Sequence, residues 1–153
     1  MSSHGQPFSY FAWAYSLPTD GSPGGRLPWG PVSDIAVHED VGDGDGAGER
    51  RTLLLTGKPP HEPAAWKRYR GGATGRLWLH GKRLLEDIGG HLDAPMFVSG
   101  RIAFLSDHEG IGNLYSCLPD GTDLRRHTDH EEFYARHASS DGSRVVYQCA
   151  GEL

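Results

Sequence analysis

The hydrophobic positions of this chain come in short runs, and each run ends at glycine, proline or aspartate. The clearest case is residues 100–118, GRIAFLSDHEGIGNLYSCL, in which apolar residues around Phe104 and around Tyr115 are separated by the polar residues 106–110. The turn-forming sequence PDGTD at 119–123 closes the second run. Two apolar runs bounded in this way predict a pair of antiparallel strands.

Similar runs follow one another along the whole sequence. No segment shows apolar residues at helical spacing over three turns, and the 22 glycines and 10 prolines disfavour long helices. The chain is therefore predicted to be mostly β. The predicted strands cover residues 8–17, 26–29, 32–37, 51–56, 75–80, 82–88, 95–98, 102–105, 113–118, 123–128, 133–138 and 144–149.

The runs also repeat. Residues 14–21 (AYSLPTDG) resemble residues 114–121 (LYSCLPDG), and residues 100–104 (GRIAF) resemble residues 142–147 (GSRVVY). The leucines at 53–55 and 77–79 occupy the corresponding places in between. A repeat of about 40 to 60 residues that holds about four short strands is typical of a β-propeller blade.

We therefore predict an all-β fold, a partial β-propeller made of four-stranded antiparallel blades. Residues 8–29 would form part of one blade, 31–88 and 93–128 two further blades, and 133–153 the start of the next. A closed propeller needs about four to eight blades. We expect the chain to be a piece of a larger protein, poorly soluble alone because its terminal blades lack neighbours.

Composition narrows the function classes. A net charge of −5 and a pI near 5.9 argue against a nucleic-acid-binding surface. The two cysteines, Cys117 and Cys149, lie in predicted strands, so we expect free thiols, a reducing compartment and a cytoplasmic protein. The N-terminus lacks the pattern of a signal peptide, and no segment approaches the length of an apolar membrane span.

The candidate chemistry is sparse. The nine histidines lie in different loops without metal-binding spacing, so we expect no metal site and no cofactor. The acidic loop at 38–48 contains DGDG but lacks the later glutamate of a calcium loop. No G-x-S-x-G sequence presents a nucleophile, so no catalytic residue is expected. Asp107 and Asp120 are predicted to accept hydrogen bonds from turn amides.

One segment has the character of a binding or gating loop. Trp66 and Tyr69 could pack over a peptide, while Lys67, Arg68 and Arg70 could bind carboxylates. In the alternative interpretation the two aromatic residues hold a long loop against a blade, and the three cations stay in solvent.

Several segments together resemble one known family. They are QPFS at 6–9, AWKRYRGG at 65–72, GRLW at 75–78, residues 100–110, NLYS at 113–116, DGTDLRRHT at 120–128, YARH at 134–137 and DG at 141–142. With these segments the chain resembles the tricorn protease family over nearly its whole length, apart from the acidic loop. The W-K-x-Y-R-G-G sequence followed by this blade pattern is the most specific part.

The resemblance implies a large parent protein. By this resemblance, the parent would have a six-bladed propeller, a seven-bladed propeller, a PDZ-like domain and a catalytic domain related to tail-specific serine peptidases. This chain would supply about three blades of the expected six, and the catalytic residues would lie elsewhere. The resemblance further implies a cytosolic peptidase that trims short peptides, assembles as a homo-oligomer, in this family a hexamer, and uses its propellers as gates.

Because residues 2–8 run directly into this interior pattern, we expect a misassigned start or a truncated gene. Two other classes stay open. The first is a non-enzymatic propeller scaffold for protein partners, such as WD-repeat or periplasmic Tol-system propellers. The second is the propeller of a prolyl-oligopeptidase-type enzyme. The adjoining reading frame would distinguish them.

Overall fold

The computed structural model describes residues 2–3, 12–39, 49–57 and 67–151, and this part of the chain contains strands and turns but no helix. Every strand pairing is antiparallel. The prediction of an all-β chain built from antiparallel sheets is thus confirmed. The DGDG sequence of the acidic loop and Trp66 of the candidate loop lie outside the described residues.

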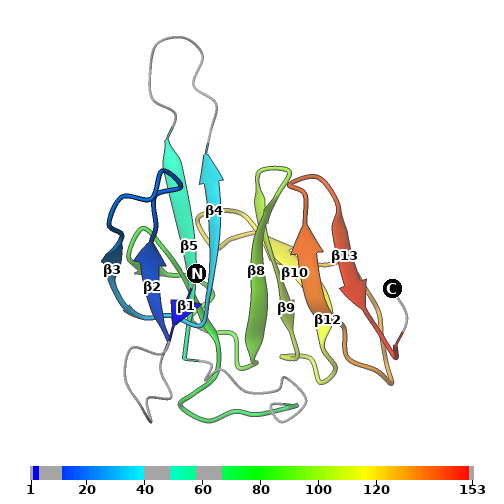
Figure 1. Ribbon diagram of the computed structural model, residues 1–153. Helices are drawn as coiled ribbons and strands as arrows, with labels where there is room; N and C mark the ends of the chain where they lie inside the picture. The colour runs from blue at the N-terminus through cyan, green and yellow to red at the C-terminus, as the bar shows by residue number, and fades with distance from the viewer. Residues whose placement is uncertain (1, 4–11, 40–48, 58–66, 152–153) are drawn as a thin grey trace.

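The strands form four sheets in the order of the sequence (Figure 1). The first sheet has three strands, β1 (Ser2–Ser3), β2 (Trp13–Ser16) and β3 (Gly25–Pro31). The second has four, β4 (Asp34–Glu39), β5 (Arg50–Thr56), β6 (Arg76–Leu79) and β7 (Lys82–Arg83).

The third and fourth sheets follow the same pattern. The third has four strands, β8 (Leu92–Val98), β9 (Arg101–Ser106), β10 (Asn113–Cys117) and β11 (Arg125–Arg126). The fourth has two, β12 (Arg136–Ser140) and β13 (Val145–Gln148). In the second, third and fourth sheets the strand that comes first in sequence lies at one edge, and these edge strands β4, β8 and β12 pack next to one another.

Tight turns join the paired strands where the sequence predicted them. His80 and Gly81 both have positive φ, 50° and 76°, in the two-residue turn between β6 and β7. Such mirror-image turns match the twist of an antiparallel pair. Asp120 supports the next outer turn, because its Oδ1 accepts hydrogen bonds from Thr122 N at 2.9 Å and Thr122 Oγ1 at 2.7 Å. The predicted role of Asp120 is confirmed.

Some strand limits differ from the prediction. The strand predicted at 82–88 is only Lys82–Arg83 (β7), with bends and turns after it, and β-bulges account for two smaller differences. β8 begins at Leu92 rather than at residue 95, because its pairing with β9 shifts by one residue between Asp93 and Met96. The bulged residue Ala94 has φ 48°. β12 carries the same irregularity between Arg136 and Ser139, with φ 51° at His137. A bulge breaks the alternation of inward and outward residues by which a strand is detected in a sequence.

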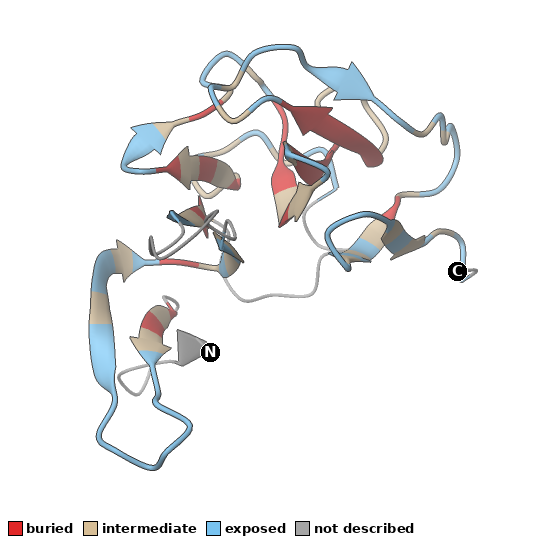
Figure 2. Cartoon of the chain, turned by 90° about the horizontal axis from the view of Figure 1, so that it is seen from above, coloured by how far each residue is buried: buried red, intermediate tan, exposed pale blue. Residues whose placement is uncertain are grey.

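Two hydrophobic clusters lie between neighbouring sheets. The larger one joins the second and third sheets through Leu53, Leu55, Leu77, Leu79, Leu84, Leu92, Ile102, Phe104, Tyr115 and Cys117. The smaller one joins the third and fourth sheets through Met96, Ala103, Leu105, Leu114 and Ala135. The buried residues accordingly concentrate in the third sheet, in the middle of the described molecule (Figure 2).

Candidate functional site

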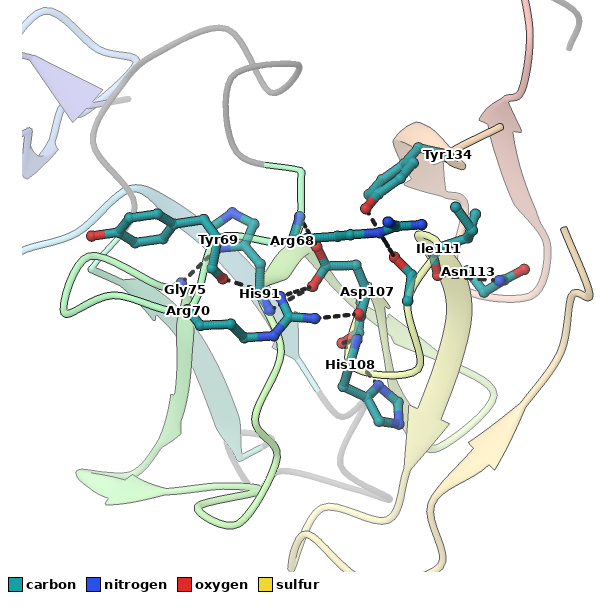
Figure 3. A network of polar contacts seen from close by, with 12 residues as sticks. Arg68, Tyr69, Arg70, Gly75, His91, Asp107, His108, Ile111, Asn113 and Tyr134 are labelled. Carbon is teal, nitrogen blue, oxygen red and sulfur yellow. Dashed lines mark hydrogen bonds and ion pairs between the residues drawn. The ribbon is translucent and has the colours of Figure 1, made fainter. Parts of the chain in front are cut away.

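The candidate loop lies in the connection between β5 and β6, and its arginines face the next sheet (Figure 3). The amide of Arg68 donates to Asp107 Oδ2 at 2.7 Å. Arg70 donates from Nη1 to Asp107 Oδ1 at 3.0 Å and from Nη2 to the carbonyl oxygen of Asp107 at 2.8 Å. The Tyr69 side chain points away from this carboxylate (Figure 3). Both arginines are therefore directed to a carboxylate of the protein itself.

Asp107 directly follows β9 and is only 3% exposed. Its Oδ1 also accepts from the amide of His91 at 2.9 Å, and His91 Nδ1 in turn accepts from the amide of Gly75 at 3.0 Å. A buried carboxylate is stable only when donors satisfy both oxygens. The Asp107 carboxylate thus accepts hydrogen bonds from groups that are distant in sequence. The prediction that it accepts from the amides of its own turn is wrong. Only its backbone oxygen serves that turn, accepting from Gly110 N at 2.9 Å.

A second contact point lies at Gly110, in the connection between β9 and β10. The carbonyl oxygen of Gly110 accepts from Arg68 Nε at 3.3 Å and from the hydroxyl of Tyr134 at 2.9 Å. The ammonium group of Lys67 lies 5.3 Å from the centre of the Tyr134 ring, within the range of a cation–π contact. Partial burial raises the pKa of the Tyr134 phenol, so this hydroxyl remains a donor at neutral pH.

Lys67, Asp107 and Tyr134 also border a cavity of about 40 Å³, which is room for water rather than for a peptide. Close backbone approaches shape the surroundings. A Cβ at Gly90 would lie 2.5 Å from the backbone nitrogen of His108, and a Cβ at Gly112 would lie 2.6 Å from the Tyr134 ring. The sequence did not predict that these two glycines are required here, because nothing distinguishes them from the other glycines of the chain.

The three residues of the acidic-histidine sequence at 107–109 have different contacts. Asp107 binds the candidate loop, whereas His108 and Glu109 contact Tyr115. Glu109 Oε2 accepts from the Tyr115 hydroxyl at 2.6 Å and from Arg126 Nη1 at 3.1 Å. His108 lies with its ring 4.5 Å from the Tyr115 ring, and burial lowers its pKa, which keeps it neutral at pH 7. Burial, followed by the hydrogen bond to Glu109, raises the pKa of Tyr115. These groups hold the β9–β10 connection on the sheet.

A serine–histidine pair also occurs, which the sequence did not reveal. Ser116 Oγ lies 2.8 Å from His127 Nε2 and accepts from Arg101 Nε at 2.8 Å. Ser116 is only 3% exposed, so a substrate cannot reach its oxygen. In the described residues no three His, Cys, Asp or Glu side chains gather closely enough to hold a metal ion.

A hollow lies along the first strands of the second, third and fourth sheets. It has a volume of about 510 Å³, and residues of β4, β8 and β12 line it. Small side chains, Ala36, Ala94 and Ala138, form part of its lining, with Asp34 and Asp141 also contributing. We call it the inner groove. Its size suits a short peptide segment, but no residue predicted as a site residue lies in it.

Cys117 and Cys149 are both free thiols, the first buried and the second partly buried. Burial raises the pKa of the Cys117 thiol to about 11, which keeps it protonated and unreactive at neutral pH. In the part of the chain that the structure describes, nothing has the length and apolar character of a membrane-spanning helix.

Repeated four-stranded antiparallel sheets packed side by side by their first strands define a β-propeller segment. The chain belongs to the family of tricorn protease N-terminal β-propeller domains, which it matches over residues 1–153. The predicted family and the predicted propeller class are therefore confirmed.

Individual relatives agree with this assignment. The chain is 73% identical over 153 residues to tricorn protease homolog 2 of Streptomyces coelicolor, covering 100% of this chain and 13% of that protein. It is 35% identical over 152 residues to the tricorn protease of Thermoplasma acidophilum, covering 97% of this chain and 13% of that protein. The crystal structure of the tricorn protease superposes with a TM-score of 0.76 at 32% identity, covering 95% of this chain and 14% of that one. The chain thus spans about one seventh of these proteins.

Proposed function

We propose that this chain is a non-catalytic β-propeller segment of a tricorn-type serine peptidase that degrades short peptides, and that its role is structural and gating. The observation that carries the proposal is the match to tricorn propeller domains along the entire chain. The Ser116–His127 pair is buried and so does not suggest a second, local catalytic centre. In this proposal catalysis belongs to other domains of the parent protein.

The inner groove supports the gating part of the proposal. The edge strands β4, β8 and β12 line it, and the small side chains of Ala36, Ala94 and Ala138 form part of this lining. The remaining blades of the propeller would extend this surface around an axis, and a peptide would pass along it. The partners are then the other domains of the parent chain, peptide substrates and further copies in a hexamer.

The loop at 66–70 is the second proposed peptide contact. Arg70 already donates to Asp107, so a peptide carboxylate at this loop would compete with an internal carboxylate for the same guanidinium group. Lys67, above the Tyr134 ring, is the better placed cation. A cytosolic location is also part of the proposal, supported by the two free thiols.

The test uses the complete reading frame that contains these residues. The full-length protein should hydrolyse short fluorogenic peptides, and a serine-directed covalent inhibitor should abolish this activity. Ala36→Trp, which places a large side chain in the inner groove, should slow peptide hydrolysis several-fold, whereas Leu124→Trp, at an exposed position outside the groove lining, should change it less. A folded full-length protein without peptidase activity would contradict the proposal and favour the alternative, a non-enzymatic scaffold for protein partners.

A further inference from the structure

Residues 67–70, in the connection between β5 and β6 of the second sheet, bind to the third sheet. These residues contact Asp107 and Gly110, both in the connection between β9 and β10. They also contact Tyr134, in the segment that leads from β11 to β12 and so to the fourth sheet. One short segment therefore joins parts of three consecutive sheets (Figure 3).

Polar contacts hold this segment in place. Lys67, Arg68 and Arg70 are exposed residues, and Tyr69 is half-buried, so hydrophobic burial contributes little to its position. Arg68 has a φ of 55°, in the left-handed region that is unfavourable for a non-glycine residue. A strained residue persists only where its surroundings fix it. Here the amide and the guanidinium group of Arg68 are both bonded to the third sheet.

We propose that residues 67–70 are a strap, anchored on Asp107, that makes the second sheet, the third sheet and the entry to the fourth open as one cooperative unit. This inference rests on contacts within the chain and does not depend on the proposed peptidase function. The strap joins the second and third sheets, which also share the Leu-rich core. By fixing their relative position, it also fixes the distance between β4 and β8, which border the inner groove.

Asp107 is the residue on which the strap depends. Its two carboxylate oxygens accept hydrogen bonds from Arg68 N, Arg70 Nη1 and His91 N, so all three partners are donors. An asparagine has nearly the same shape, but one of its two terminal atoms donates and cannot accept. Asp107→Asn would therefore place an NH₂ group against a donor without creating a cavity. The matched control is Asp120→Asn, because Asp120 serves only the local turn at Thr122 among the described residues.

The experiment is amide hydrogen exchange on the full-length protein that contains these residues, measured by mass spectrometry on short overlapping peptides. We expect Asp107→Asn to speed exchange at Arg68, Gly75 and His91 by at least tenfold, with a smaller acceleration at Ala135, whose amide donates to Gly112 O beside Tyr134. Asp120→Asn should speed exchange only near Thr122. Faster exchange confined to residues 67–70, or no change at His91 and Ala135, would overturn the proposal.

Tyr134→Phe provides a second route should Asp107→Asn fail to fold. It removes only the hydroxyl that donates to Gly110 O and leaves the Asp107 contacts in place. If the strap is one unit, exchange at Arg68 should rise about two- to fivefold although Arg68 N is bonded to Asp107 and not to Tyr134. An effect limited to residues 110 and 134 would show that the contacts are independent and would refute the strap.

Discussion

The two faces of the third sheet are packed in different ways. Toward the second sheet, Ile102 and Phe104 meet large leucines in the larger hydrophobic cluster. Toward the fourth sheet, Ala103 and Leu105 meet smaller side chains such as Ala135 in the smaller cluster. Alternate residues of one strand, β9, serve the two interfaces, so the unbroken apolar sequence IAFL reflects burial on both faces rather than on one.

Polar groups also contribute at the interface that contains the smaller hydrophobic cluster. Asn113, only 1% exposed, donates to the carbonyl oxygens of Ile111 and His130 and accepts from Thr128 Oγ1 and His130 N, at distances between 2.8 and 3.2 Å. Leucine contacts thus hold the second and third sheets together. A single amide side chain fixes the path from the third sheet toward the fourth.

The largest effect should come from the larger cluster. Leu77→Ala removes a fully buried side chain and should lower the free energy of unfolding by about 3 kcal/mol, because it leaves a cavity that rigid strands cannot close. Leu105→Ala, in the smaller cluster, should cost about 1 kcal/mol less, since smaller neighbours surround it. Urea unfolding of both variants measures the difference. Equal losses would mean that the two interfaces are equivalent.

Asn113→Ala should have the next largest effect. Four hydrogen-bonding groups would lose their partner inside the protein, which should cost about 2 kcal/mol. Asn113→Asp keeps the acceptor but loses both donated bonds, so it should fall between alanine and the native protein at neutral pH. Thermal unfolding of the two variants makes the comparison, and a loss below that of Leu105→Ala would weaken the assigned role.

The smallest effect is expected for Cys117, whose side chain belongs to the larger hydrophobic cluster. The folded-state pKa of Cys117 is raised to about 11 from a usual value near 9, so the folded state holds this proton more tightly than the unfolded state does. Its contribution to stability is therefore complete below pH 9 and is lost as the pH rises from about 9 to 11. Cys117→Ala should flatten this decline in pH-dependent unfolding, and Cys149→Ala should not. At pH 8, iodoacetamide should modify Cys149 first.

Strands and turns could be predicted because their signals are local. The run at 102–105 and the Asp-Gly turns each lie within a few residues, and the blade repeat recurs along the chain. The start of β8 could not be predicted, since Pro95 and the bulge at Ala94 interrupt the alternation. The Asp107 contacts join residues 37 and 39 positions apart, and nothing local in either segment specifies the partner. The peptide-binding role of residues 66–70 stays a prediction.

The bulges at Ala94 and His137 limit how sheets can be exchanged between related propellers. They lie about 43 residues apart, the same separation as Ile102 and Val145, so the irregularity recurs in phase with the blade that contains it. The extra residue is therefore part of the repeating unit in the third and fourth sheets. A chimaera that exchanges sheets between related propellers should keep its inner strands aligned only when both breakpoints lie outside the bulge. Deleting the bulged residue would leave a regular pairing, whereas deleting a residue elsewhere in the strand would turn each following side chain to the opposite face.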